Sequence, residues 1–316
     1  MATQNDFLPF ATGPGANVVD QATYAALSAL TTGFLSGTAQ STQLNKVWRQ
    51  SSIVAAVIAQ FIVAQTGQAA VDDGTTATLL ANFTKAVGAA SNKMGLFLGV
   101  QVFTSSGTYT PGTYMIGGQS VTATKAKVRG IGAGGAGGSC ASTTSSQGAA
   151  GSGGNAGAYG EIWIASGLTT QPVTIGAPGA PSAAGANAGG AGGASSFGTL
   201  AIFGGGSGGL GGVASPTPFA VIPSASQASC SGTGAFIVAG RGAVAKQSFG
   251  ISTGVVNGSS GADTLFGSGG QGAGSGAGGA ASGYGAGGGG AGVGATGTQN
   301  VGGAGAPGLI IVEEYA

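Results

Sequence analysis

Glycine tracts with a period of three residues dominate the second part of this chain and limit what it can fold into. Three tracts follow the pattern X-G-G-X-G-G-X, at residues 133–139, 188–194 and 207–213, and irregular relatives lie at 267–280 and 283–297. A polyproline-II-type helix has three residues per turn. The pattern therefore places every side chain on one edge and leaves bare backbone on the other two, where neighbouring helices can exchange N–H···O=C bonds. We predict packed polyglycine-II helices.

Two other glycine-rich structures fit the tracts less well. Collagen needs one glycine per triplet over long runs with abundant proline, whereas here two residues in three are glycine and the chain holds ten prolines. A flexible glycine linker remains the alternative, although the tracts alternate with strand-like segments. Ordering glycine costs more backbone entropy than ordering any other residue, so packed helices require many hydrogen bonds between tracts or a surrounding shell.

The first 96 residues differ in composition and have the patterns of helices. They hold eight of the 70 glycines. Asp20 is a suitable N-cap, and Gly37 and Gly67 are suitable C-terminal stops. We predict three helices, at Gln21 to about Leu35, Thr42–Gln65 and Thr76–Ala90.

The second of these helices carries an apolar seam at nearly heptad spacing. Its members are Leu44, Val47, Val54, Ile58 and Phe61, with Ser51 in the gap. Such a seam fits a helical bundle within one chain, and it fits equally the association of three copies about a three-fold axis. Two or three heptads do not distinguish the two.

From about residue 97 the pattern changes to that of strands. Segments rich in β-branched and aromatic residues are bounded by glycine and proline, which is typical of strands and turns. They lie at 100–118, 120–132, 158–166, 171–176, 198–203, 235–240 and 308–314.

Charge and composition argue against several classes of function. The chain has no histidine, so it lacks the usual base of a serine or cysteine nucleophile and the commonest metal ligand. Nine basic residues among 316 cannot neutralise many phosphates, so we expect no nucleic-acid partner. The adjacent Glu313 and Glu314 lie on a predicted strand and should face opposite sides. We therefore expect no enzyme, no cofactor and no metal site.

The cysteines and the N-terminus bear on the compartment. Cys140 and Cys230 lack metal-ligand spacing, and they form either two free thiols or, outside a cell, a disulfide. The sequence begins without a secretory signal pattern. Its most apolar run, Ile53–Ala64, is too short to span a bilayer. We therefore expect synthesis in a cytoplasm without membrane insertion.

Several segments, taken in order, resemble the glycine-rich C-terminal domain of bacteriophage tail fibre proteins. They are QVFTSSGTYTPGTY, VTATKAKVRGIGAGGAGG, GGNAGAYGEIWIASGLTTQPVTIGAPG, GGASSFG and GGAGAPGLIIVEEYA. The helical segment STQLNKVWRQSSIVAAVIAQFIVAQTG is similar to the N-terminal half of such fibres. VFTSSGTYT and the last strand are the more specific parts, since glycine-rich matches arise easily.

The resemblance implies a homotrimeric fibre in the virion tail. Its N-terminal part would bind baseplate or tail-tip proteins. Its glycine-rich part would bind a bacterial surface receptor, namely an outer-membrane protein, lipopolysaccharide or a pilus. The alternative is a purely structural tail or baseplate fibre. The expected fold is α+β, with a helical attachment and trimerisation region over 1–96 and a glycine-rich, β-sandwich-like domain with polyglycine-II helices over 97–316.

Receptor specificity is expected in the inserts between glycine tracts, because a rigid scaffold commonly carries binding residues on its loops. The inserts are 141–147, 213–231 and 241–266. Aromatic and aliphatic side chains suit protein loops or sugar rings, and cations suit an anionic surface. The candidates are Phe219, Ile222, Arg241, Lys246 and Phe249. The alternative is that the aromatic rings pack on the strands and the cations are merely solvated.

Overall fold

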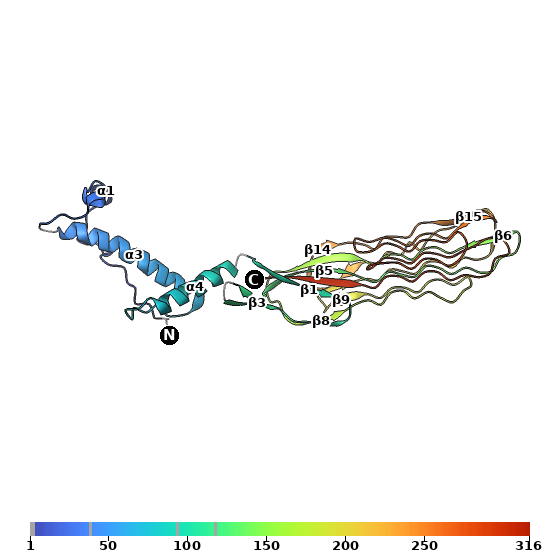
Figure 1. Cartoon of the computed structure of the whole chain (residues 1–316), viewed down its shortest axis with the longest axis horizontal. Coiled ribbons are helices and arrows are strands. Elements are labelled where there is room, and N and C mark those ends of the chain that lie inside the picture. Colours follow the sequence, from blue (N-terminus) through green and yellow to red (C-terminus); the bar gives the residue numbers. More distant parts are fainter. Residues whose placement is uncertain (1–3, 38–39, 93–94, 117–118) are drawn as a thin grey trace. The chain divides into compact units, whose positions relative to one another are not determined.

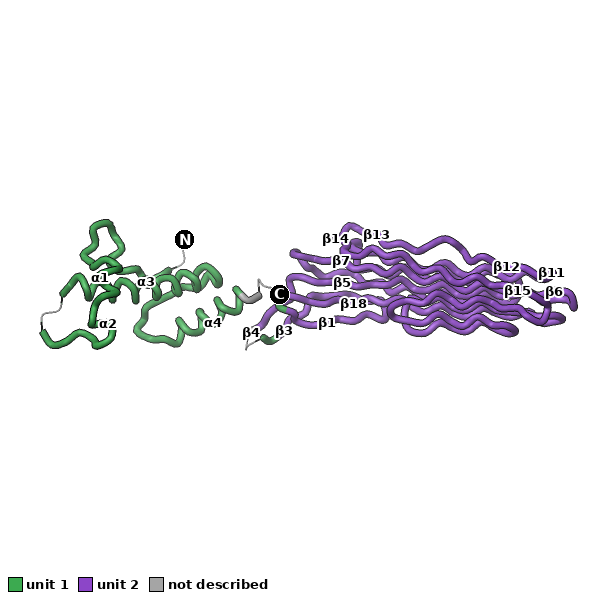
Figure 2. The backbone as a smooth tube through the Cα atoms, turned by 90° about the horizontal axis from the view of Figure 1, so that it is seen from above, with its two compact units in different colours: residues 1–96, 115–119 green, residues 97–114, 120–316 purple. Residues whose placement is uncertain are grey.

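The computed structural model describes residues 4–37, 40–92, 95–116 and 119–316. The chain divides into two compact units (Figure 2), one of residues 1–96 with 115–119 and one of residues 97–114 with 120–316. Helices occupy the first unit, and the second unit holds antiparallel strands in several sheets joined by long glycine-rich segments. The predicted α+β class is confirmed.

Two long helices, α3 (Ser41–Thr66) and α4 (Ala77–Asn92), pack against each other in the first unit. The buried face of α3 includes Ala56, Ala59 and Ile62, and the Phe61 ring lies 6.2 Å from that of Phe83 on α4. Gly67 adopts a left-handed φ of 66° and ends α3. Both helices are confirmed to within two residues at each end.

The predicted helix from Gln21 to Leu35 is wrong in its extent. The structure has two short helices, α1 (Gln21–Ala25) and α2 (Ala29–Thr32), and Asp20 caps α1 as expected. Gly33, with φ 75°, ends α2 before Leu35. Neither helix buries a residue. Packing therefore does not offset the cost of a longer helix, and short isolated helices are marginal in water.

Two five-stranded antiparallel sheets form one end of the second unit. The first has the order β1 (Phe97–Phe103), β18 (Leu309–Tyr315), β5 (Lys125–Ile131), β7 (Tyr159–Ile164), β14 (Ala235–Ala239). The second has the order β13 (Cys230–Ser231), β10 (Ala201–Phe203), β9 (Ser195–Phe197), β8 (Gln171–Thr174), β2 (Gly107–Tyr109). Each long segment of predicted strand contains at least one of these strands.

Both sheets contribute to one apolar core. The first sheet supplies residues such as Val128, Ile162 and Val312, and the second supplies Phe197 and Phe203. Along β5, the apolar and small residues face this core, while the intervening lysines and arginine are only partly buried. The strict alternation in the sequence thus fixes which face of the strand is inside.

Two three-stranded sheets complete the second unit. One has the order β11 (Ser215–Pro216), β6 (Gln147–Ala150), β17 (Gly292–Val293), and the other has the order β12 (Phe219–Val221), β15 (Ser248–Ser252), β16 (Val255–Asn257). A two-stranded sheet of β3 (Thr113–Ile116) and β4 (Gln119–Thr122) includes residues assigned to each unit. In Figure 1, β6 and β15 lie at the end of the second unit farthest from the C-terminus. We call this the distal end.

Glycine tracts run between the two ends of the second unit. Neighbouring tracts are joined by backbone hydrogen bonds whose direction repeats every three residues. In the tract 133–139, the N–H groups of residues 133, 136 and 139 donate to the carbonyls of Gly193, Gly190 and Asn187. The N–H groups of 134 and 137 donate to the carbonyls of Ala306 and Gly303. Those of 135 and 138 donate to the carbonyls of Asn155 and Ser152. All seven bonds are 2.8–3.0 Å long. Three different neighbours thus receive bonds in rotation.

The same tract accepts bonds from further neighbours. The carbonyls of 133, 136 and 139 accept from Gly206, Gly209 and Gly212, and those of 135 and 138 accept from Gly288 and Ala291. A Cβ on Gly137 would lie 1.9 Å from the Gly289 carbonyl oxygen. Glycine is therefore required here by the close approach of another backbone.

Candidate functional site

Three of the five predicted receptor-binding residues come together on one antiparallel ribbon at the distal end. Strand β12 pairs with β15, with Phe219 opposite Gly250, Ala220 opposite Phe249 and Val221 opposite Ser248. Ile222 follows β12 directly. We call residues 219–222 and 248–252 the distal ribbon. Its pairing joins two inserts that lie in separate parts of the sequence.

An apolar cleft of about 450 Å³ lies beside the distal ribbon. Phe219, Ile222, Leu210 and Val213 line it together with smaller residues. Ile222 is 71% exposed and Val213 is 63% exposed. Both side chains are thus free to contact a partner, and the cleft is lined by uncharged residues, which suits an apolar surface.

Leu210 and Val213 were missed as site residues by the sequence analysis. They are the X residues of the tract 207–213, which the pattern predicts as scaffold. Their large apolar side chains distinguish them from the alanines and serines at the same positions of the other two regular tracts. This difference in side-chain size is the sequence signal that could have identified them as site residues.

Phe219 has a structural role as well as an accessible edge. Its ring covers Gly250, where an added Cβ would lie 2.4 Å from a ring carbon. The residue is half-buried. On the neighbouring strand β15, Phe249 is more open and Ile251 is 65% exposed, and Val255 at the start of β16 is 52% exposed.

The two predicted cations do not line the apolar cleft. Arg241 lines a different cleft of about 170 Å³, together with Tyr159, Asp263 and Thr264. Lys246 is exposed on the segment that enters β15. The structure therefore separates Arg241 from the aromatic and aliphatic candidates.

Glu314 occupies a fully buried position among hydrogen-bond donors. Its carboxylate accepts bonds from Tyr109 Oη and Gly112 N, both at 2.7 Å, and from Tyr114 Oη. Burial alone would raise the pKa of Glu314, but the hydrogen bonds from Tyr114, Gly112, Tyr109 and Gln101 outweigh it and lower the pKa. The group is a charged structural anchor between β18, β2 and the segment before β3.

Glu313 faces the opposite side of β18, as predicted. It pairs with Arg129 at 2.5 Å, beside a second ion pair of 2.7 Å between Lys127 and Glu161. Hence the two adjacent carboxylates do not share a site.

Both cysteines are free thiols and do not form a disulfide. Cys140 Sγ donates to the Ala291 carbonyl and Cys230 Sγ donates to that of Tyr159. Burial raises the pKa of Cys140 to about 12. Among the described residues, no three potential metal ligands gather at one place.

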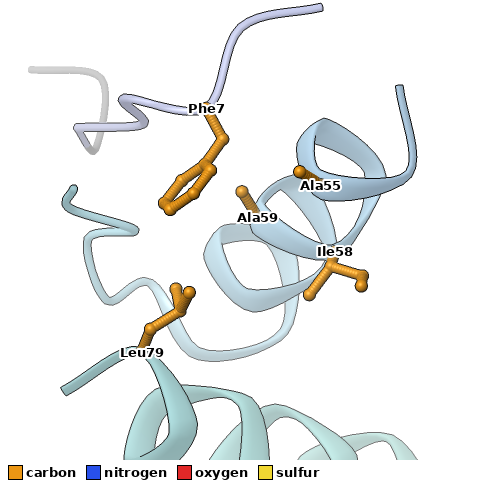
Figure 3. A pocket seen from close by; sticks show the side chains of 5 residues that line it. All are labelled: Phe7, Ala55, Ile58, Ala59 and Leu79. Atoms are coloured by element: carbon orange, nitrogen blue, oxygen red, sulfur yellow. The ribbon is translucent and has the colours of Figure 1, made fainter. Parts of the chain in front are cut away.

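The predicted helical seam is divided in the structure. Val54 and Ile58 are exposed, Leu44 and Val47 are half-buried, and Phe61 packs on α4. Figure 3 shows Phe7, Ala59 and Leu79 around an apolar pocket of about 160 Å³, with Ile58 at its border. Ile58 also lines a second apolar cleft, together with Leu80 and Phe83. The apolar face around Ile58 is open.

Helix α3 is longer than the apolar run recognised in the sequence. Its 26 residues are long and apolar enough to cross a membrane by length and composition alone. Core helices of soluble proteins pass the same test when they are buried, but only 17% of the most apolar stretch is buried here. The expected lack of membrane insertion therefore stays a prediction.

Comparison of the chain with protein-family models gives no match, and comparison with curated proteins gives none either.

Proposed function

We propose that this protein is a bacteriophage tail fibre that binds a bacterial surface receptor through its distal end. The supporting observation is the distal ribbon, which presents exposed apolar side chains next to an open cleft at the end of a hydrogen-bonded glycine scaffold. Exposed clusters of apolar side chains commonly mark interaction sites. The helical unit would attach the fibre to baseplate or tail-tip proteins of the virion.

The proposal includes polyglycine-II helices as the scaffold. In the tract 133–139, N–H groups three residues apart donate to the same neighbouring segment, which supports this conformation. A polyproline-II-type helix has three residues per turn, so its N–H groups point in the same direction at every third residue. A scaffold bonded in several directions would hold the distal ribbon rigidly. Rigid presentation lowers the entropy lost on binding.

Replacement of Phe219, Lys246 and Phe249 by alanine together should abolish binding to host cells. The change removes two rings and a cation from the distal ribbon and its entry, while the glycine scaffold stays intact. Binding is measured with the fluorescently labelled full chain on a panel of bacterial strains. The matched control replaces Lys85, Ile237 and Val238 by alanine, which are exposed elsewhere. Unchanged binding by the distal variant would leave the purely structural fibre as the better account.

The proposal also includes a homotrimer formed through the helical unit. Val54 is 60% exposed and Ile58 is 39% exposed on α3, and Ile58 lines a cleft with Leu80 and Phe83 of α4. Burial of the exposed parts of these side chains should stabilise association by about 1 kcal/mol each. Light scattering after size exclusion should give three times the monomer mass of 29.3 kDa.

Aspartate at both Val54 and Ile58 should convert the trimer to monomers, because two charges per chain would enter an apolar interface. The control carries aspartate at Gln50 and Gln60, two exposed polar positions of the same helix. A wild-type chain that elutes as a monomer, or a double variant that keeps the wild-type mass, would exclude this interface.

A further inference from the structure

Asn155 is a buried polar side chain inside the glycine scaffold, at a position where the neighbouring tracts carry small residues. It is 1% exposed and lies in the tract 151–158. Buried side-chain amides are costly unless their hydrogen bonds are made. The identity of its partners therefore indicates what the side chain is for.

The partners of Asn155 belong mainly to the two inserts that form the distal ribbon. Its Nδ2 donates to the carbonyls of Ser224 and Ser226, at 2.9 and 3.0 Å, and to Ser207 Oγ at 2.9 Å. Its Oδ1 accepts the N–H of Ala245 at 2.9 Å. Carbonyls only accept and an N–H only donates, so these partners fix the orientation of the amide.

These contacts lie where the ribbon joins the scaffold. Ser224 and Ser226 follow β12, whose last residue is Val221, and Ala245 precedes β15, whose first residue is Ser248. Val221 and Ser248 are opposite each other in the ribbon. One side chain therefore holds the outgoing end of one strand and the incoming end of its partner.

We infer that Asn155 is the positioning residue of the distal ribbon. It fixes the spacing of the two strand ends and thereby the placement of Phe219 and Ile222 at the cleft and of Phe249 on the paired strand. Ser207 assists, because its Oγ also donates to the Ser226 carbonyl at 3.1 Å. The consequence for receptor binding rests on the proposed function, whereas the placement of the ribbon does not.

Asn155→Ala in the full chain tests this role by hydrogen exchange. The change leaves the Ser224 carbonyl and the Ala245 N–H without a partner and removes one of the two donors to the Ser226 carbonyl. Residues 221–227 and 243–249 should therefore exchange at least about tenfold faster than in the wild type. Exchange in β5 and β18 should stay at the wild-type rate. Ser207→Ala is a smaller change and should accelerate exchange in 221–227 by about threefold. This variant provides the test if Asn155→Ala does not fold.

The matched control is Ser139→Ala in the neighbouring tract. Ser139 is fully buried, donates to the Ser182 carbonyl and accepts from Gly302 N, and thus makes no bond to the ribbon. This variant should lose stability without faster exchange in the ribbon. Unchanged exchange in 221–227 and 243–249 for folded Asn155→Ala, or equal acceleration in Ser139→Ala, would overturn the inference.

Cell binding separates this inference from the proposed function. On a strain that the wild type binds, Asn155→Ala should bind at least about tenfold more weakly, and Ser139→Ala should bind within about twofold of the wild type. Equal binding by Asn155→Ala together with unchanged exchange would overturn the positioning role, whereas equal binding together with faster exchange would place recognition outside the distal ribbon. If the wild type binds no strain, the proposed function fails, while the exchange measurement still decides the role of Asn155.

Discussion

Gly137→Ala should lower the free energy of unfolding by about 3 kcal/mol or more, although it adds a single methyl group. The added Cβ would lie 1.9 Å from the Gly289 carbonyl oxygen and 2.3 Å from its carbon. These are backbone atoms, so no rotamer change relieves the clash. The tracts must separate, which weakens the bond from Gly137 N to Gly303 O.

The matched control is Gly254→Ala, between β15 and β16. A Cβ there meets no atom within 4 Å, and the expected change is below about 1 kcal/mol in either direction. Urea unfolding at one fixed protein concentration compares the variants. Equal stability of the two variants would contradict the close packing of the glycine tracts.

Glu314→Gln should also have a large effect and lower the free energy of unfolding by about 3 kcal/mol. The amide keeps the shape of the carboxylate but replaces one acceptor oxygen by a donor, which then faces N–H and O–H groups that also donate. Tyr109 Oη, which is fully buried, or Gly112 N, which is half-buried, then loses its partner. Glu313→Gln is the neighbouring control. Its partly exposed ion pair contributes about 1 kcal/mol or less.

The pH dependence of stability should differ between wild type and Glu314→Gln. The folded state lowers the pKa of Glu314 from an ordinary value of 4.5, so the stabilisation is complete above that pH and is lost as the pH falls through the folded pKa. The wild type should therefore lose stability in acid more steeply than the variant. Parallel pH profiles of the unfolding free energy for the two proteins would exclude the anchoring role of this carboxylate.

The sequence predicts well those elements whose signal is local. The alternation of Lys125–Ile131 predicts both β5 and its buried face, and the apolar pattern of Thr42–Gln65 with Gly67 predicts α3 and its end. The predicted helix at Gln21–Leu35 was wrong in its extent for two reasons. Gly33 is a local stop signal that ends α2, and neither α1 nor α2 buries a residue that would support a longer helix.

The sequence does not predict which glycine tracts pair with each other when they are far apart in the chain. The tract 133–139 lies antiparallel to 187–193 and parallel to 206–212. Near-identical glycine repeats contain no side-chain information that would select these neighbours. The same limit applies to the candidate site. Phe219 and Phe249 are recognisable as insert aromatics, but their pairing, the cleft beside Leu210 and the contacts of Asn155 depend on how the tracts assemble.

The most direct test of the account is the binding of the labelled full chain to intact bacteria across a strain panel. We expect saturable binding to a subset of strains, competed by unlabelled wild-type protein and not by the variant with alanine at Phe219, Lys246 and Phe249. Binding to no strain would contradict a receptor-binding fibre. Competition by that variant as effective as that by the wild type would show that recognition lies outside the distal ribbon.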